Sequence, residues 1–139
     1  LRPTTQIGWH SASGGCSTIG GGNCNVVSGA YSIVGGGCCN TASTLSAIGS
    51  VVVGGTSNYA QCGASFIGAG TLNMTNGTCA FIGAGQSNSA CTSSSVVGGT
   101  SNFANCTGTF IGGGSGNNVC GNCSSIVGGV RNSNDTKSF

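Results

Sequence analysis

Pairs of residues, mostly apolar, recur along the chain, each followed directly by glycine. They are Thr18-Ile19, Ile33-Val34, Val52-Val53, Phe66-Ile67, Phe81-Ile82, Val96-Val97, Phe110-Ile111 and Ile126-Val127. Four or five residues after each such glycine comes an asparagine: Asn25, Asn40, Asn58, Asn73, Asn88, Asn102, Asn117 and Asn132. Successive asparagines are 15, 18, 15, 15, 14, 15 and 15 residues apart, so one short unit is repeated eight times.

A unit of this length suits one coil of a β-solenoid, because helical-pair and propeller repeats run to roughly 33–50 residues. We therefore predict an all-β fold, a parallel β-solenoid (β-roll) of about eight coils over residues 16–132. At ~4.8 Å per coil the rod would be on the order of 40 Å long. Residues 1–15 are predicted to be an entry segment in which Trp9 and His10 cap the first coil, and residues 133–139 an exit segment.

Each apolar pair is expected to point one side chain inward and one outward, because side chains alternate across a strand. A second column lies two residues after each asparagine: Val27, Ala42, Ala60, Thr75, Ala90, Ala104, Val119 and Asn134. The outward side chains would form an apolar stripe, and covering such a stripe is favourable by roughly 25 cal/mol per Å². We therefore expect a homo-oligomer, most simply a homotrimer with the stripe at its axis.

The glycines that follow the pairs are predicted to form the corners, since glycine adopts positive φ without strain and asparagine is the next best tolerated residue. They are Gly20, Gly35, Gly54, Gly68, Gly83, Gly98, Gly112 and Gly128. Their distance to the asparagine varies by one residue, which predicts a corner with and without an extra residue. The asparagines are also expected to bond from coil to coil. Within the 18-residue spacing, Leu45-Ser46-Ala47-Ile48-Gly49 is a near copy of the motif and predicts a protruding insertion.

Charge is almost missing from the sequence: 139 residues carry three Lys or Arg and one Asp or Glu. This disfavours nucleic acid as a partner, because phosphate binding needs clustered cations. The longest apolar runs are far shorter than the ~20 residues of a membrane-spanning helix. General acid–base catalysis needs a carboxylate pair or an oriented histidine, and Asp135 and His10 lie at opposite ends, so we do not expect an enzyme. The threonines form no unbroken column, which disfavours an ice-binding face.

The segment Ala30-Tyr31-Ser32-Ile33-Val34-Gly35-Gly36-Gly37-Cys38-Cys39-Asn40-Thr41-Ala42-Ser43 resembles the head repeats of YadA-type trimeric autotransporter adhesins. It is still more similar to the Ser-x-Ile-Gly-Gly-Gly-x-x-Asn-x-Ala repeats of phage tail fibres, and the resemblance covers roughly residues 16 to 132. It implies three chains wound side by side as left-handed β-rolls that reach and bind a host surface. The sequence shows no membrane anchor or coiled-coil stalk, and its ten cysteines exceed what such repeats usually carry.

The cysteines fall into columns of the repeat, which indicates either disulfides of an extracellular fibre or small residues in buried slots. Stacking in one column leaves Cβ atoms slightly too far apart for a disulfide, so diagonal pairs are the better candidates. These are Cys91 with Cys106, Cys106 with Cys120, and Cys24 with Cys38. The motif Cys120-Gly121-Asn122-Cys123 has metal-ligand spacing but no second ligand pair, so we expect no metal and no cofactor.

Two further sets of residues bear on function. Sequons for N-glycosylation begin at Asn73, Asn76, Asn105, Asn122 and Asn134, a number that chance also explains in so polar a chain. Trp9, Tyr31, Tyr59 and Phe103 could stack on sugar rings, or could simply pack. The sequence thus favours a fibre segment, extracellular or on a virion surface, that holds loops for attachment to a host receptor or glycan. The alternative is a purely structural extracellular filament subunit, glycosylated if it is secreted.

Overall fold

The structure is a computed structural model that describes residues 9–43 and 48–135. Its strands are two residues long and alternate between two sheets. The first sheet contains β1 (Ser11–Ala12), β3 (Val26–Val27), β5 (Thr41–Ala42), β7 (Tyr59–Ala60), β9 (Met74–Thr75), β11 (Ser89–Ala90), β13 (Phe103–Ala104), β15 (Asn118–Val119) and β17 (Ser133–Asn134). The second contains β2 (Thr18–Ile19), β4 (Ile33–Val34), β6 (Val51–Val52), β8 (Phe66–Ile67), β10 (Phe81–Ile82), β12 (Ser95–Val96), β14 (Phe110–Ile111) and β16 (Ser125–Ile126).

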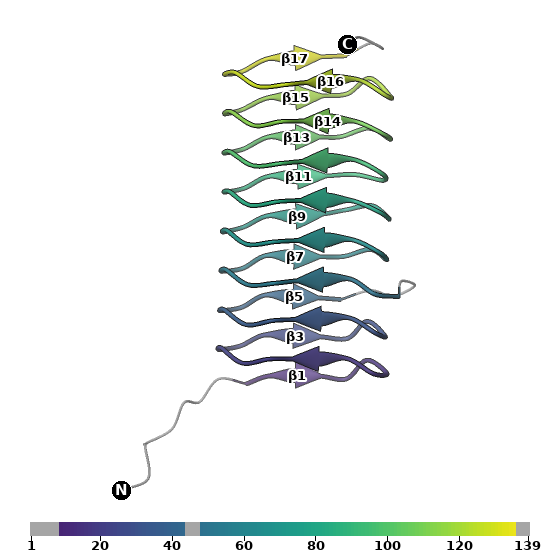
Figure 1. Cartoon of the computed structure of the whole chain (residues 1–139), viewed down its shortest axis with the longest axis vertical. Coiled ribbons are helices and arrows are strands. Elements are labelled where there is room, and N and C mark those ends of the chain that lie inside the picture. The colour runs from purple at the N-terminus through teal and green to yellow at the C-terminus, as the bar shows by residue number, and fades with distance from the viewer. Residues whose placement is uncertain (1–8, 44–47, 136–139) are drawn as a thin grey trace, which may run out of the picture.

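Every strand pairs in parallel with the equivalent strand of each neighbouring coil in its sheet, so the chain climbs as a solenoid (Figure 1). The odd-numbered strands stack in one layer and the even-numbered strands run the opposite way in the other (Figure 1). A third ladder of single parallel bridges joins Asn23, Cys38, Thr56, Thr71, Gln86, Thr100, Ser115 and Val130. The predicted fold class, a parallel β-solenoid of about eight coils, is confirmed.

Parallel pairing extends beyond the predicted limits of 16 and 132 at both ends. Ser11 of β1 pairs with Val26, and Ser133 of β17 pairs with Asn118. Trp9, which was expected to cap the first coil together with His10, is 81% exposed and does not cover it. Of the predicted insertion at 45–49, residues 45–47 lie outside the described residues, and the side chain of Ile48 is exposed.

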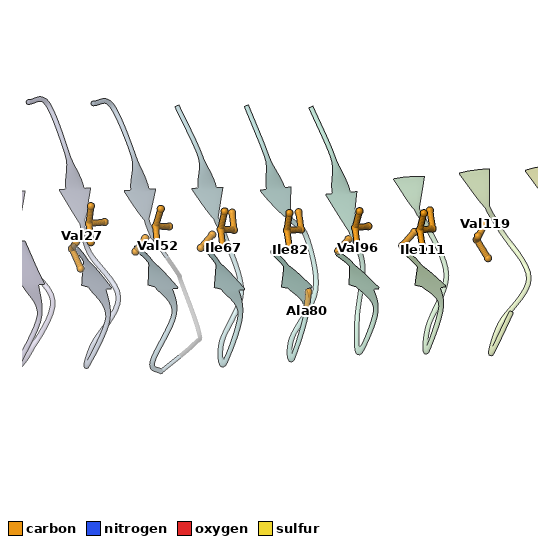
Figure 2. Close-up of a cluster of buried hydrophobic side chains, with 13 residues drawn as sticks. Val27, Val52, Ile67, Ala80, Ile82, Val96, Ile111 and Val119 are labelled. Carbon is orange, nitrogen blue, oxygen red and sulfur yellow. The ribbon is translucent and has the colours of Figure 1, made fainter. Parts of the chain in front are cut away.

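The core consists of one inward side chain from each strand of a coil. The second sheet contributes Val34, Val52, Ile67, Ile82, Val96 and Ile111, and the first contributes Val27, Ala42, Ala60, Thr75, Ala90, Ala104 and Val119, all 0% exposed. Figure 2 shows the larger of these side chains between the two layers. Branched residues in one layer face mainly small residues in the other, which keeps the coil narrow. The predicted alternation and the predicted second column are both confirmed.

When the repeats are aligned on the glycine that follows each apolar pair, three of the eight coils are shifted by one residue relative to the pairing in the structure. Val52 pairs with Ile67, Val96 with Ile111 and Ile126 with Ile111, so Val53, Val97 and Val127 occupy the position that Gly68 and Gly112 occupy elsewhere. The number of residues from this position to the asparagine is the same in every coil. The predicted second form of the corner, with an extra residue, therefore does not exist. The differences in coil length instead lie between the asparagine and the next strand of the second sheet.

Thr75 is a core residue whose hydroxyl group has no hydrogen-bond partner. Among the described residues, its Oγ1 is the only buried side-chain oxygen or nitrogen without a hydrogen-bond partner. A buried, unpaired hydroxyl costs about 1–3 kcal/mol. Thr75→Val, with nearly the same shape, should therefore raise the free energy of unfolding by about 1 kcal/mol in denaturant titration.

Thr109→Val is the matched control, because the Thr109 hydroxyl donates to the Cys106 carbonyl oxygen at 2.9 Å and lies 3.0 Å from Ser94 Oγ. That change should destabilise the protein. A Thr75→Val variant that loses as much stability as Thr109→Val would contradict the assignment.

Candidate functional surfaces

The asparagine column forms a continuous ladder along one corner of the solenoid. The Oδ1 atom of each asparagine accepts the backbone N–H of the next asparagine at 2.9–3.1 Å, from Asn25 through Asn132. Each Nδ2 of Asn25 to Asn117 donates to the carbonyl oxygen of the residue four positions earlier and to a glycine carbonyl oxygen in the next coil, as in Asn88 with Ala84 and Gly99. The predicted coil-to-coil bonding is confirmed, and the ladder satisfies corner groups that water cannot reach.

The backbone role assigned to these asparagines and to the predicted corner glycines is wrong. Positive φ belongs to the residue before each asparagine, for example Ser57 at 54° and Leu72 at 58°. It also belongs to the glycine three positions before each asparagine: Gly22, Gly37, Gly55, Gly70, Gly85, Gly99, Gly114 and Gly129. Gly20, Gly35, Gly54, Gly68, Gly83, Gly98, Gly112 and Gly128, which were predicted to fill this role, do not have positive φ.

A second buried polar column lies at the opposite corner, two residues before each inward side chain of the second sheet. It comprises Ser32, Ser50, Ser65, Ser94, Thr109 and Ser124, with Ala80 at the remaining buried position. Ser50 Oγ lies 3.1 Å from Ser32 Oγ, and Ser94 Oγ donates to the Cys106 carbonyl oxygen at 2.7 Å. Sequence reasoning missed this role, although a serine or threonine before nearly every apolar pair was the available signal.

Apolar side chains also line the outer faces of both sheets. On the second sheet they are Ile33, Val51, Phe66, Phe81 and Phe110, and on the first sheet Val26, Tyr59, Met74 and Phe103. The rings of Phe66 and Phe81 stack with their centroids 5.4 Å apart and their planes 6° apart. Phe81, Phe103 and Phe110 remain 38%, 40% and 38% exposed. The sequence predicted one outward stripe. The solenoid has apolar side chains on two outer faces, and on the first sheet the polar residues Thr41, Ser89 and Asn118 interrupt them.

The four aromatic residues predicted as sugar contacts do not gather in one place. Tyr59 and Phe103 share an outer column of the first sheet, but Met74 and Ser89 lie between them. Tyr31 lies in the turn before β4, where it is 60% exposed, and Trp9 precedes β1. The threonines of the single-bridge ladder form no continuous column, because Gln86 lies between Thr71 and Thr100.

The ten cysteines are free thiols, and two groups of them lie close together. Cys38 Sγ is 3.4 Å from Cys39 Sγ, and the pKa of the Cys39 thiol is raised chiefly by this hydrogen bond, while a bond with the Cys24 thiol opposes the rise. Burial raises the pKa of Cys91, and the electrostatic interaction with nearby Cys106 adds to the rise. Cys120 follows Val119, which pairs with Ala104, so Cys120 remains diagonal to Cys106.

The sequons differ in accessibility. Asn73 belongs to the buried ladder, and its Nδ2 donates to the carbonyl oxygens of Ala69 and Gly85, so the folded coil has no room for a glycan there. Asn76, Asn105 and Asn122 are exposed in the turns that lead from the first sheet to the second, and Asn134 is half-buried in β17.

Among the described residues, no three His, Cys, Asp or Glu side chains are grouped so that they could hold a metal ion. That part of the chain also forms no helix with the length and hydrophobicity to cross a membrane. No protein-family model matches the chain, and a search of curated proteins finds no similar sequence.

Proposed function

We propose that the chain is a rigid segment of a homotrimeric fibre, extracellular or on a virion surface, whose turns are presented for attachment to a host surface or glycan. The observation that carries this proposal is that both outer faces of a rod with almost no charge carry apolar side chains. A lone solenoid would leave both faces in water, where exposed patches of this kind cause association.

The size of the effect favours association of several chains. An aromatic side chain buries about 150–250 Å² in full, so covering the exposed part of one ring such as Phe81 or Phe110 gains about 2 kcal/mol. Association costs roughly 4–15 kcal/mol in lost freedom of motion. A single ring cannot offset this cost, but the aligned columns on both sheets together can.

The arrangement of the two faces also supports a second candidate. Because the sheets lie on opposite sides of the coil (Figure 1), each chain can contact two neighbours through different faces. Such unlike contacts close into a ring when the rotation between chains permits, and otherwise continue into an open array. A closed ring of three is the proposed fibre. An open array is the purely structural filament, which the scattered aromatic residues would suit equally well.

Phe81→Ser should weaken the association of the full chain about 30-fold or more, because about 2 kcal/mol of burial is lost at each contact. The solenoid itself should remain folded, since Ser95 occupies the paired position in the next coil. Sedimentation velocity over a concentration series would measure the change, with circular dichroism as the check on folding.

Gln86→Ser is the matched control, because Gln86 is an exposed residue of the single-bridge ladder, away from both apolar faces. It should associate like the wild type. If Phe81→Ser associates as strongly as Gln86→Ser, the outer face of the second sheet is not the contact surface.

A further inference from the structure

We infer that Cys24 and Cys39 form a disulfide between neighbouring coils when the protein meets a disulfide oxidant such as oxidised glutathione. The inference does not depend on the proposed fibre function, because both residues lie in one chain at the asparagine corner rather than on the outer face of a sheet. It replaces the diagonal pair of Cys24 with Cys38 that the sequence favoured.

The backbone places these two residues one above the other. Each directly precedes a ladder asparagine, and their φ angles are 54° and 57°. The N–H of Cys39 donates to the carbonyl oxygen of Asn23 at 2.9 Å, which holds the two corners together. Equivalent residues of adjacent coils are ~4.8 Å apart, within the roughly 4.4–6.8 Å that Cα atoms of a disulfide span. Their Cβ separation is slightly long, so the bridge needs a small shift at a corner where Cys39 is exposed.

This column contains neighbouring cysteines in one place only. In the later coils its residues are Ser57, Leu72, Ser87, Ser101, Gly116 and Arg131. The Cys24 thiol is also near enough to Cys39 to lower the pKa of the Cys39 thiol, against the effect of Cys38.

Cys38 is the competitor, since its sulfur lies 3.4 Å from that of Cys39. A bridge between sequence neighbours is disfavoured by the backbone, because consecutive Cα atoms are only about 3.8 Å apart across a trans peptide. The hydrogen bond with Cys38 also raises the pKa of Cys39. The fraction of reactive Cys39 thiolate, and with it the rate of oxidation, should therefore increase with pH towards that raised pKa.

The reaction is a two-step thiol–disulfide exchange. One cysteine thiolate attacks oxidised glutathione, forms a mixed disulfide and releases one glutathione thiolate. The second cysteine then loses its proton and attacks the protein sulfur of the mixed disulfide, which releases the second glutathione. Two protein thiols are thereby oxidised to one disulfide, and one glutathione disulfide is reduced to two thiols.

The bridge would fasten the second coil to the first, near the end of the rod where coils open most easily. It closes a loop of about 15 residues, which corresponds to a rise in the unfolding temperature on the order of 10 °C.

The test is to incubate the full reduced chain with oxidised and reduced glutathione, block the remaining thiols and map disulfides by mass spectrometry after chymotryptic cleavage. Tyr31 lies between the two coils' cysteines, so cleavage there leaves one peptide with Cys16 and Cys24 and another with Cys38 and Cys39. The two peptides stay linked only if a disulfide joins the coils, and fragmentation of the linked pair identifies the bridged cysteines. We expect the linked pair in material that runs as a single chain without reductant, and a higher unfolding temperature than in the reduced protein.

Three variants distinguish the proposal from its competitors. Cys38→Ser and Cys16→Ser should retain both the linked peptides and the rise in unfolding temperature. Cys39→Ser should lose both while remaining folded by circular dichroism, because serine already fills this column at Ser57 and Ser87. A Cys38–Cys39 bridge, or a Cys24 that stays reduced until the protein unfolds, would overturn the inference.

Discussion

Replacement of Asn88 by alanine should lower the free energy of unfolding by about 4 kcal/mol. The change leaves the N–H of Asn102 without its acceptor and the carbonyl oxygen of Ala84 without its donor, in a corner where the side chain is 1% exposed. The carbonyl oxygen of Gly99 loses one of its two donors and keeps the N–H of Gln86. Each buried group without a partner costs about 1–3 kcal/mol, and the cavity left by the side chain adds to the loss. Urea titration followed by circular dichroism would measure it.

Asn105→Ala is the control for this prediction. Asn105 is exposed, and its Nδ2 bonds only at the surface, with Asn118 Oδ1 at 2.8 Å. Its loss should change stability by no more than about 0.5 kcal/mol. Equal effects of Asn88→Ala and Asn105→Ala would show that the ladder is not what holds the coils in register.

Gly55→Ala should be about as damaging as the loss of a ladder asparagine, on the order of 4 kcal/mol. Gly55 has a φ of 91°, and a Cβ there would collide with the carbonyl oxygen of Gly70 and lie 2.6 Å from Asn58 Nδ2. Backbone strain and forced displacement of the next coil both contribute. Thermal and denaturant unfolding of the purified variant would give the loss directly.

The neighbouring Gly54→Ala is a stringent control, because the two changes are chemically identical and one residue apart. A Cβ at Gly54 has nothing within 4 Å, and two other coils already carry alanine at the equivalent position, as Ala69 and Ala84. Stability should stay within about 0.5 kcal/mol of the wild type. The opposite ranking of the two variants would show that Gly54, as the sequence suggested, is the conformationally required residue.

These two glycines illustrate where sequence reasoning succeeded and where it failed. The period of about 15 residues and the repeated apolar positions predicted the solenoid, because both follow from strand geometry. The alignment of three corners could not be predicted from the sequence, because in these coils a valine, such as Val53, stands where the other coils have glycine. The pairing of Val52 with Ile67 shows that Val53, not Gly54, is equivalent to Gly68. The glycine with positive φ in this coil is therefore Gly55.

The candidate surfaces were less predictable, for a related reason. The outward residues of the second sheet belong mostly to the apolar pairs, whereas those of the first sheet alternate between apolar and polar, so the sequence indicated only one stripe. Asn73 begins a sequon in the sequence, but in the fold it belongs to the buried asparagine ladder. Cys24 and Cys39 became neighbours only when both were placed directly before ladder asparagines in adjacent coils.

The measurement that most directly tests the central claim is the mass of the intact assembly of the full chain, from native mass spectrometry with sedimentation equilibrium at matched concentration. We expect a closed trimer held by the outer faces of the two sheets. An open-ended series of masses would instead favour the structural filament. A monomer at micromolar concentration would contradict the claim that these apolar faces are covered by other copies of the chain.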